Sequence, residues 1–315
     1  MQLISELSKS SPSKETLLTI GVFDGVHLGH RHLISMLAQH ASEANLVSGV
    51  VTFNVNPKAV LSPRTRMARL TTLEEKASLL KSLGVELVIP ITFNTDVAAL
   101  SAREFVLYLK KYLKMRGLII GPNFALGRGR EGNVAVLQSL GKELDFTVEV
   151  VKPLLVEGSL VSSTAVRKAL ARGDMNTVTS MLGRYFSVSG EVVTGMERGR
   201  VLGFPTANLD VDSEQALPED GVYATLTRLG DKLYQSVTNI GVKPTFGGTD
   251  RMVEAFILDF TGDLYGQKMT VEFVERLRSE IKFAGPEELT AQIKKDVERA
   301  RTILKKPYAG VKHVS

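Results

Sequence analysis

Two histidines that could act on a phosphate occur in the run Gly21-Val22-Phe23-Asp24-Gly25-Val26-His27-Leu28-Gly29-His30. Apolar residues 17–23 predict a buried strand, and Leu33, Leu37 and Ala41 follow at helical spacing. The histidines are therefore expected at a strand-to-helix turn, where free backbone N–H groups and the helix dipole favour a bound anion. Two imidazoles there can stabilise the charge that develops when a nucleotide phosphate is attacked.

A second candidate anion site is the run Ser162-Ser163-Thr164-Ala165-Val166-Arg167. It places hydroxyl groups at the predicted start of a helix and an arginine one turn inside it, which suits a triphosphate or a pyrophosphate. An ordinary helix N-cap explains the hydroxyl groups equally well. The loop of residues 121–130, with three glycines and two arginines, is a weaker candidate for a phosphate- or flavin-facing segment.

The longest chemistry-bearing motif is Gly195-Met196-Glu197-Arg198-Gly199-Arg200-Val201-Leu202-Gly203-Phe204-Pro205-Thr206-Ala207-Asn208. Its glycines allow the backbone to approach phosphates, and the Thr206 hydroxyl and Asn208 amide oxygen are hard ligands suited to Mg²⁺. It is not a Walker loop, because the Gly-Lys-Ser/Thr ending is missing. Further on, Glu254 lies in a predicted strand, where its carboxylate could deprotonate a substrate hydroxyl; a solvent-facing glutamate is the alternative.

Composition limits the classes of protein that fit. The chain has 315 residues, no cysteine, 43% hydrophobic residues and a formal net charge of +5. Disulfides, thiolate nucleophiles and iron–sulfur clusters are therefore excluded, and two domains with proper cores are expected. Neither a signal peptide nor a stretch of membrane-spanning length is seen, so we expect a cytoplasmic protein without membrane partners. No Lys/Arg tract predicts nucleic-acid binding.

The elements that must position these residues follow two patterns. Up to about Gly183, apolar runs at 48–53, 85–91, 117–121 and 147–151 alternate with helical periodicity, which predicts a parallel sheet wrapped by helices. Ser101 with Glu104 predicts a capping box. Ligands of such sheets bind beyond the carboxyl ends of the strands, where the two histidines would emerge.

After Gly183, closely spaced strand-like runs predict a small antiparallel barrel; they are residues 186–193, 222–229, 233–240, 253–260 and 269–274. A final helix, with Leu289, Ile293, Val297, Ala300 and Leu304 on one stripe, is expected to pack on it. We therefore predict an α/β domain at residues 1–183 and a barrel domain at residues 184–315.

The order of these motifs resembles that of the bacterial bifunctional riboflavin kinase/FMN adenylyltransferases, from about Leu17 to Leu304. Besides the runs quoted above, the resemblance rests on Asn239-Ile240-Gly241-Val242-Lys243-Pro244-Thr245 and on Leu258-Asp259-Phe260 followed by Leu264-Tyr265-Gly266. It implies a nucleotidyltransferase-type, Rossmann-like parallel sheet followed by an antiparallel riboflavin-kinase barrel with a C-terminal helix. The implied reactions are phosphorylation of riboflavin to FMN by the barrel, and adenylylation of FMN to FAD with release of pyrophosphate by the first domain.

The resemblance also implies residue roles. Glu254 would be the kinase base, Thr206 and Asn208 would hold Mg²⁺, and His27 and His30 would stabilise the charge of adenylyl transfer. ATP and its phosphates would be bound by Gly21, Phe23, Asp24, Gly29, Asn56, Ser163, Thr164, Arg167, Gly199, Arg200, Gly203 and Pro205. Asn123 and Arg278 would bind flavin. The implied partners are riboflavin, FMN, FAD and ATP or ADP; the sequence is compatible with a homo-oligomer and does not set its size.

The chain departs from the family pattern after its second strand. The family usually has Thr-Phe-x-Pro-His-Pro, whereas residues 52–57 read Thr-Phe-Asn-Val-Asn-Pro, so that Asn56 replaces a histidine. Smaller departures are Ala125, Leu126, Ala165 and Phe256. They keep a second hypothesis open, in which the barrel is a riboflavin kinase and the first domain is a weakened adenylyltransferase or a non-catalytic regulatory module. A third reading, a class I aminoacyl-tRNA synthetase, shares His-x-Gly-His but lacks the lysine-rich second signature and an anticodon-binding domain.

Overall fold

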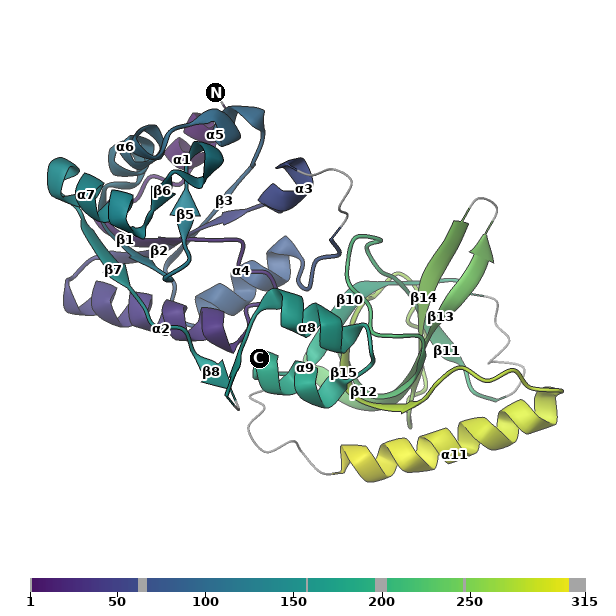
Figure 1. Cartoon of the computed structure of the whole chain (residues 1–315). Helices are drawn as coiled ribbons and strands as arrows, with labels where there is room; N and C mark the ends of the chain where they lie inside the picture. The colour runs from purple at the N-terminus through teal and green to yellow at the C-terminus, as the bar shows by residue number, and fades with distance from the viewer. Residues whose placement is uncertain (1, 62–66, 157, 196–202, 246–247, 306–315) are drawn as a thin grey trace. The chain divides into compact units, whose positions relative to one another are not determined.

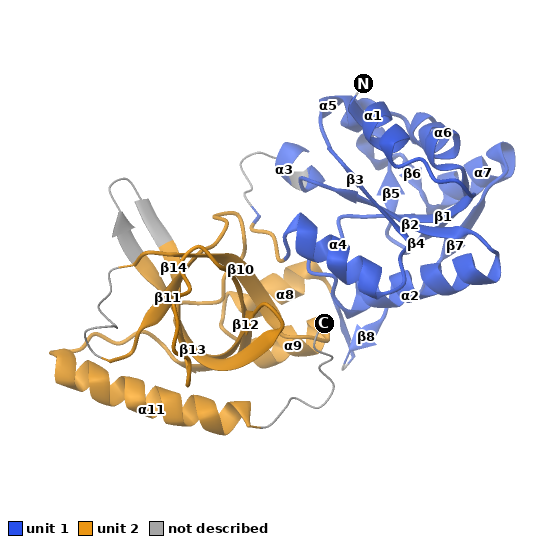
Figure 2. Ribbon diagram, turned by 180° about the vertical axis from the view of Figure 1, so that it is seen from behind, with its two compact units in different colours: residues 1–67, 71–161, 314 blue, residues 68–70, 162–313, 315 orange. Residues whose placement is uncertain are grey.

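The computed structural model describes residues 2–61, 67–156, 158–195, 203–245 and 248–305 (Figure 1). Its contacts divide the chain into two compact units, coloured separately in Figure 2. Unit 1 holds most residues up to Val161, and unit 2 holds residues 68–70 together with the chain from Ser162 onward. Each unit has its own hydrophobic core.

Unit 1 is built on a five-stranded sheet in the order β3-β2-β1-β4-β7, and every pair in it is parallel. This confirms the predicted parallel sheet. The strands are β1 (Thr16–Ile20), β2 (Val47–Phe53), β3 (Leu87–Ile91), β4 (Met115–Ile120) and β7 (Thr147–Val150). The chain runs from β1 outward to β3 and then returns to β4 on the other side of β1. The strand order therefore reverses between β1 and β4.

Helices cover both faces of this sheet because neighbouring strand residues alternate between two apolar clusters. Leu18 of β1 packs with one cluster, which contains buried residues of α1, α6 and α7, and Leu17 packs with the other, which contains buried residues of α2 and α4. The helices of unit 1 are α1 (Gln2–Lys9), α2 (Leu28–Glu43), α3 (Pro57–Leu61), α4 (Leu73–Ser82), α5 (Thr95–Ala99), α6 (Ala102–Leu113), α7 (Val134–Leu144) and the short 3-10 helix η1 (Arg128–Arg130). The predicted capping box of Ser101 and Glu104 is present at the start of α6.

The first strand is shorter than predicted. It ends at Ile20 rather than at Phe23, and the chain then enters a tight turn. Phe23, Gly25 and Val26 have φ of 49°, 79° and 37°. A β-branched residue with positive φ is strained, and such strain collects at functional sites. The apolar side chains of Phe23 and Val26 are buried all the same, which is why the apolar pattern overran the strand.

Two short hairpins complete unit 1. One joins β5 (Ala125–Leu126) to β6 (Gly132–Asn133) in the loop after β4, and the other joins β8 (Leu155–Val156) to β9 (Ser159–Leu160).

Unit 2 is a closed barrel in the order β10-β11-β14-β13-β12-β15, with antiparallel pairs, as predicted. Its strands are β10 (Phe186–Val193), β11 (Thr206–Asp210), β12 (Gly221–Leu229), β13 (Lys232–Thr245), β14 (Gly248–Ile257) and β15 (Lys268–Arg278). The sequence pattern did not predict β11, because this five-residue strand lies inside the glycine-rich motif. The predicted strand at 253–260 is wrong at both ends, since β14 begins earlier and the chain turns at Asp259, whose φ is 56°.

Within its described residues, unit 2 contains the helices α8 (Ser163–Leu170), α9 (Met175–Leu182) and α11 (Pro286–Leu304). Ala300 of α11 packs with Val222, Ala224, Val237 and Leu277 of the barrel, which confirms the predicted role of the last helix. The contacts group α8 and α9 with the barrel, whereas the predicted boundary between residues 183 and 184 lies after these helices. That boundary stays a prediction.

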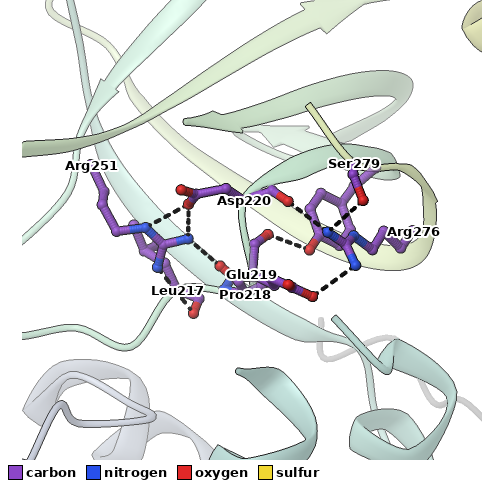
Figure 3. Close-up of polar contacts among 8 residues, drawn as sticks. Leu217, Pro218, Glu219, Asp220, Arg251, Arg276 and Ser279 are labelled. Atoms are coloured by element: carbon purple, nitrogen blue, oxygen red, sulfur yellow. Dashed lines mark hydrogen bonds and ion pairs between the residues drawn. The ribbon is translucent and has the colours of Figure 1, made fainter. Parts of the chain in front are cut away.

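The segment Leu217–Asp220, which leads into β12, is held by two arginines (Figure 3). Arg276 donates to Glu219 Oε2 and to the Asp220 carbonyl, both at 2.7 Å. Arg251 donates from Nε to Asp220 Oδ1 at 2.9 Å. Tyr223 donates to the Glu219 carbonyl, and burial of this tyrosine raises its pKa to about 12. These contacts fix the ends of β12, β14 and β15 at one side of the barrel.

Candidate functional site

The first group of predicted residues gathers at the carboxyl end of the unit 1 sheet. The turn with the histidines follows β1 directly, and the loop with Asn123 follows β4. Because β1 and β4 flank the reversal of strand order, these two loops line the place where open parallel sheets bind ligands. The position predicted from sequence is thus the one that the topology favours.

The two histidines of this turn face each other. Their rings stack with centroids 3.6 Å apart and an interplanar angle of 18°. His27 is the N-cap of α2, and its Nδ1 accepts the backbone N–H of His30 at 3.3 Å. In a neutral His27 the proton then lies on Nε2, which makes that atom a donor. The chain therefore presents a donor at the start of a helix, where the dipole favours anions.

His30 is the imidazole whose pKa is strongly shifted. Burial lowers its pKa well below 6.5, and electrostatic interactions with His27 and Lys76 lower it further. Its Nδ1 is buried and has no hydrogen-bond partner in the described part of the chain. The Phe23 ring meets it edge-on, with centroids 5.2 Å apart. His30 is consequently neutral at pH 7, with a ring nitrogen left for a ligand.

The other predicted residues of this turn make contacts that hold its backbone in place. Asp24 is buried, and its Oδ1 accepts the backbone N–H of Thr71 at 3.2 Å. Gly21 donates to the Val51 carbonyl at 3.0 Å, and a Cβ there would lie 3.0 Å from the Phe23 ring. A Cβ on Gly29 would lie 3.3 Å from the His27 ring. These contacts explain why small residues and a carboxylate occur at these positions.

The other predicted residues of adenylyl transfer are placed less directly. Asn56 lies between β2 and α3 and is half-buried. Asn123 is exposed after β4, and its carbonyl accepts a hydrogen bond from Arg130 at 3.1 Å. The ligands of both side chains stay predictions.

The serine-rich run begins a helix, as predicted. Ser162 caps α8 by accepting the backbone N–H of Ala165 at 3.2 Å. Ser163 is half-buried and Thr164 is exposed in the first turn, and Arg167 donates from Nε to the Ala68 carbonyl at 2.7 Å. Ser162 thus acts as the ordinary N-cap of α8, and the hydroxyls of Ser163 and Thr164 are not the capping groups.

A second group of predicted residues forms a row across the barrel of unit 2. Asn208 of β11 pairs with Glu254 of β14, and Glu254 pairs with Asn239 of β13. Directly paired residues project from the same face of a sheet, about 5 Å apart at Cβ. The opposite face at β14 carries the buried Val253 and Ala255, which belong to the barrel core. Glu254 is therefore half-buried on the outer face, between two amide side chains.

The glycine-rich motif brings its ends together at this row. Thr206 lies two residues before Asn208 on β11, so both side chains share the outer face. A Cβ on Gly195 would lie 2.0 Å from Asn208 Nδ2, so the backbone at Gly195 rests against that amide. Gly203 has φ of 83° and Pro205 is exposed just before β11. Gly199 and Arg200 lie outside the described residues.

Arg278 continues the row on β15, because it pairs with Val222, which pairs with Asn239. It donates to Asp296 of α11, with Nε and Nη2 each 2.9 Å from Oδ2, and to the Ser279 carbonyl at 3.0 Å. Its guanidinium also lies 5.7 Å from the centre of the Phe283 ring. Arg278 fastens the last helix next to the row of polar residues, a role that sequence reasoning missed; its predicted flavin contact stays a prediction.

Together, the two units define a class of two-domain transferase, with a nucleotidyltransferase-like sheet and a six-stranded barrel. Comparison with family models agrees, since residues 9–165 match FAD synthetase and residues 182–304 match riboflavin kinase. The chain is 40% identical over 300 residues to the bifunctional riboflavin kinase/FMN adenylyltransferase of Escherichia coli strain K12, covering 95% of both chains. It is 38% identical over 304 residues to the protein of that description from Haemophilus influenzae, covering 96% of this chain and 98% of the relative.

The chain therefore belongs to the family of bifunctional riboflavin kinase/FMN adenylyltransferases, whose two component families use ATP as co-substrate. Among solved structures it is similar to one described as a macrolide-efflux protein from Streptococcus pneumoniae, with a TM-score of 0.88, 29% identity, and coverage of 96% of this chain and 97% of that one. Within the described residues, no helix is long and apolar enough to cross a membrane.

Proposed function

We propose that unit 2 phosphorylates riboflavin with ATP and that unit 1 adenylylates the FMN so formed. The observation that carries the first half is the row Asn208, Glu254 and Asn239, which sets one carboxylate between two amides beside a glycine-rich segment. The stacked pair of His27 and His30 at the reversal of strand order supports the second half. Family membership supports both reactions together.

In the kinase reaction, Glu254 accepts the proton of the ribityl 5′-hydroxyl while that oxygen forms a bond to the γ-phosphorus of ATP and ADP leaves. The carboxylate is half-exposed on the outer face of the barrel, where a flavin can reach it. Thr206 and Asn208 lie on the same face and hold the phosphates.

The donor set of this row fits Mg²⁺, which prefers hard oxygen ligands. The Thr206 hydroxyl and the Asn208 amide oxygen supply two such atoms on one face of β11, and the Glu254 carboxylate lies opposite Asn208. Thr206 and Asn208 would hold Mg²⁺, which would supply neutralisation of charge on the transferring phosphoryl group.

In the adenylyl transfer reaction, a phosphate oxygen of FMN forms a bond to the α-phosphorus of ATP, and the bond to the pyrophosphate oxygen breaks. His27 Nε2–H and the N-terminus of α2 stabilise the charge on the reacting phosphates. The polyphosphate contacts of Ser163, Thr164 and Arg167, which lie on α8 of unit 2, and the flavin contact of Asn123 stay predictions. Cytoplasmic location and self-association remain predictions.

The first test is a time course of purified protein with riboflavin, ATP and Mg²⁺, in which chromatography separates riboflavin, FMN and FAD. We expect FMN first and FAD later. Accumulation of FMN without FAD favours the second hypothesis, in which Asn56 marks a weakened or regulatory unit 1. If neither product forms, the proposed function is wrong.

The kinase base is tested with Glu254→Gln, which keeps the shape of the side chain and removes its basicity. We expect FMN formation to fall by about a hundredfold or more, with riboflavin binding retained, because the variant cannot accept the hydroxyl proton. Glu191→Gln, a change at an exposed strand glutamate of the same barrel, is the matched control. Normal FMN formation by Glu254→Gln would remove Glu254 from this role.

A further inference from the structure

The turn that leads into His27 has a strained backbone. Phe23 and Val26 have positive φ although neither is a glycine, and Val26 is β-branched. Residues in such conformations persist only where the surrounding structure holds them. The contacts made by the turn before His27 are therefore part of what keeps the histidine in place.

A threonine from a distant part of the chain contacts this turn. Thr71 lies between α3 and α4, 46 residues after Gly25, and only 4% of it is exposed. Its backbone N–H donates to Asp24 Oδ1 at 3.2 Å. Its hydroxyl oxygen accepts the backbone N–H of Gly25 at 3.1 Å, and the hydroxyl donates to Asp24 Oδ1 at 3.4 Å. Thr71 thus binds both a side chain and the backbone of the turn.

The hydroxyl group allows Thr71 to make two of these contacts. A hydroxyl donates one hydrogen bond and can also accept, so it serves a carboxylate and an N–H group together. Serine has the same group, whereas valine has nearly the shape of threonine and no oxygen. Both contacts of the hydroxyl are buried, where the loss of a hydrogen-bonding partner is most costly.

The contact with Gly25 lies close to the histidine pair. Gly25 is two residues before His27, whose Nδ1 caps α2 by accepting the backbone N–H of His30. A displacement of Gly25 therefore displaces the His27 ring and the first turn of α2. Stabilisation of charge by fixed donors depends on their exact place, and a shift of about 1 Å can slow a reaction about a hundredfold.

We propose that Thr71 is a positioning residue of the adenylyl transfer site, which holds Asp24 and Gly25 in the turn that places His27 at the start of α2. This rests on the proposed adenylyl transfer by unit 1. In this role Thr71 acts through the turn and not on the phosphates.

The test must separate positioning from a loss of stability. Thr71→Val removes the hydroxyl, and Thr71→Ser keeps it. Thr16→Val is the matched control, because Thr16 is also fully buried in unit 1 and its hydroxyl donates to the Leu113 carbonyl at 2.8 Å. Thr16 is the first residue of β1, at the end of the strand away from the turn.

Each full-length variant is assayed for kcat and KM of FAD formation from FMN and ATP, for FMN formation from riboflavin, and for Tm. Hydrogen exchange at the backbone amides of Gly25 and His30 is followed by NMR. The amide of His30 reports on the helix cap, because it donates to His27 Nδ1.

We expect Thr71→Val to lower kcat for FAD formation about tenfold to a hundredfold, to change KM for ATP less, and to form FMN at the normal rate. Exchange should become faster at Gly25 and also at His30. Thr71→Ser should keep most of the activity. Thr16→Val should lower Tm and leave kcat for FAD formation and both exchange rates unchanged.

Three results overturn the proposal. The first is a normal kcat for FAD formation in Thr71→Val. The second is unchanged exchange at His30 in that variant, which would confine the effect of Thr71 to its own contacts. The third is equal slowing of FAD formation in Thr16→Val, or in Thr71→Ser, because the loss would then not follow the Thr71 hydroxyl.

Failure of the proposed function gives a separate result. If the unsubstituted protein makes no FAD from FMN, adenylyl transfer is wrong and Thr71 cannot serve it, while exchange at His30 still shows whether Thr71 holds the histidine turn. If Thr71→Val does not fold, Thr71→Ala takes its place, because it removes the hydroxyl without setting a methyl group against the Asp24 carboxylate. A normal kcat for FAD formation in Thr71→Ala then overturns the proposal.

Discussion

His27 combines two roles in one imidazole ring. Its Nδ1 caps helix α2, and its face stacks on His30. Serine, threonine, aspartate and asparagine are the usual N-caps, so a histidine in this position shows that the helix start and the candidate site are one structure. Changing His27 is therefore expected to affect both the first turn of α2 and any anion bound there.

The buried state of His30 makes stability depend on pH. The pKa of His30 in the folded chain lies well below 6.5, whereas the unfolded chain takes up a proton near 6.5. The contribution of His30 to the free energy of unfolding is therefore complete above pH 6.5. It is lost as the pH falls from 6.5 toward the lower pKa that His30 has in the folded chain. We expect the Tm of His30→Asn to fall less than the Tm of the unsubstituted protein when the pH is lowered from about 7.5 to about 5.5.

His32→Asn, two residues further along the same helix, is the control. Its Tm should fall as much as that of the unsubstituted protein over the same pH change. Equal losses in all three proteins would mean that His30 does not carry this pH dependence.

The position of the Asn208 side-chain amide requires a glycine at residue 195. Because a Cβ at this residue would lie 2.0 Å from Asn208 Nδ2, Gly195→Ala must displace the Asn208 side chain. We expect FMN formation to fall by about tenfold to a hundredfold, while FAD formation from supplied FMN stays normal. Gly285→Ala is the control, because its Cβ meets only Glu287 Oε2, at 3.6 Å. Full kinase activity in Gly195→Ala would show that the position of Asn208 is unimportant.

Residue types at short spacing were predictable, and residues defined by distant contacts were not. The histidine pair and the cap of α8 follow from local pattern. Lys76 sits in the sequence Glu-Glu-Lys, which is typical of a solvated helix face, and only its contacts with carbonyls 23 and 54 residues away show otherwise. Arg278 likewise meets Asp296 through a helix that the sequence could not place on the barrel with this precision.

Among the elements, β11 shows best how the strands create a site. It is five residues long, and its pairing with β14 brings Asn208 opposite Glu254. The sequence singled out Asn208 and Glu254, but the pairing that brings them together joins residues 46 apart in the chain. Register between such strands is set by the whole barrel, so it could not be derived from local pattern.

This row predicts the effect of an added charge. Asn239→Asp places a second carboxylate directly opposite Glu254 on the neighbouring strand. Like charges in paired positions disfavour ionisation, so Glu254 would stay protonated up to a higher pH. We expect the acidic limb of kcat/KM for FMN formation to move to higher pH. Its position is measured by initial rates across a pH series.

Asn239→Ala serves as the matched change, because it removes the amide without adding charge. An acidic limb that moves equally in both variants, or in neither, would contradict a direct effect of the carboxylate on Glu254.

At the scale of the whole molecule, the chain carries two candidate sites in two units, one in the sheet and one on the barrel. The division into a parallel α/β part and an antiparallel barrel was predictable, because the spacing of apolar residues changes near residue 183. The placement of α8 and α9 with the barrel was not, since helices between two domains carry no local mark of the core that they join.

Two sites in one chain allow a reciprocal test. The double variant His27→Ala/His30→Ala should lose FAD formation by about a hundredfold or more and keep FMN formation, because both histidines lie in unit 1. Both rates are measured on the same preparation. Equal loss of both activities would indicate a damaged fold or a shared site.

The sheet of unit 1 is open, whereas that of unit 2 closes into a barrel. A closed barrel has no free strand edge, whereas the sheet of unit 1 ends at β3 and β7. Such edges can pair with another chain, which is a common route to aggregation. Pro90 in β3 cannot donate a ladder hydrogen bond, and β7 carries the charged Glu149. Pairing of these two sheet edges with another chain is thus opposed by Pro90 and Glu149.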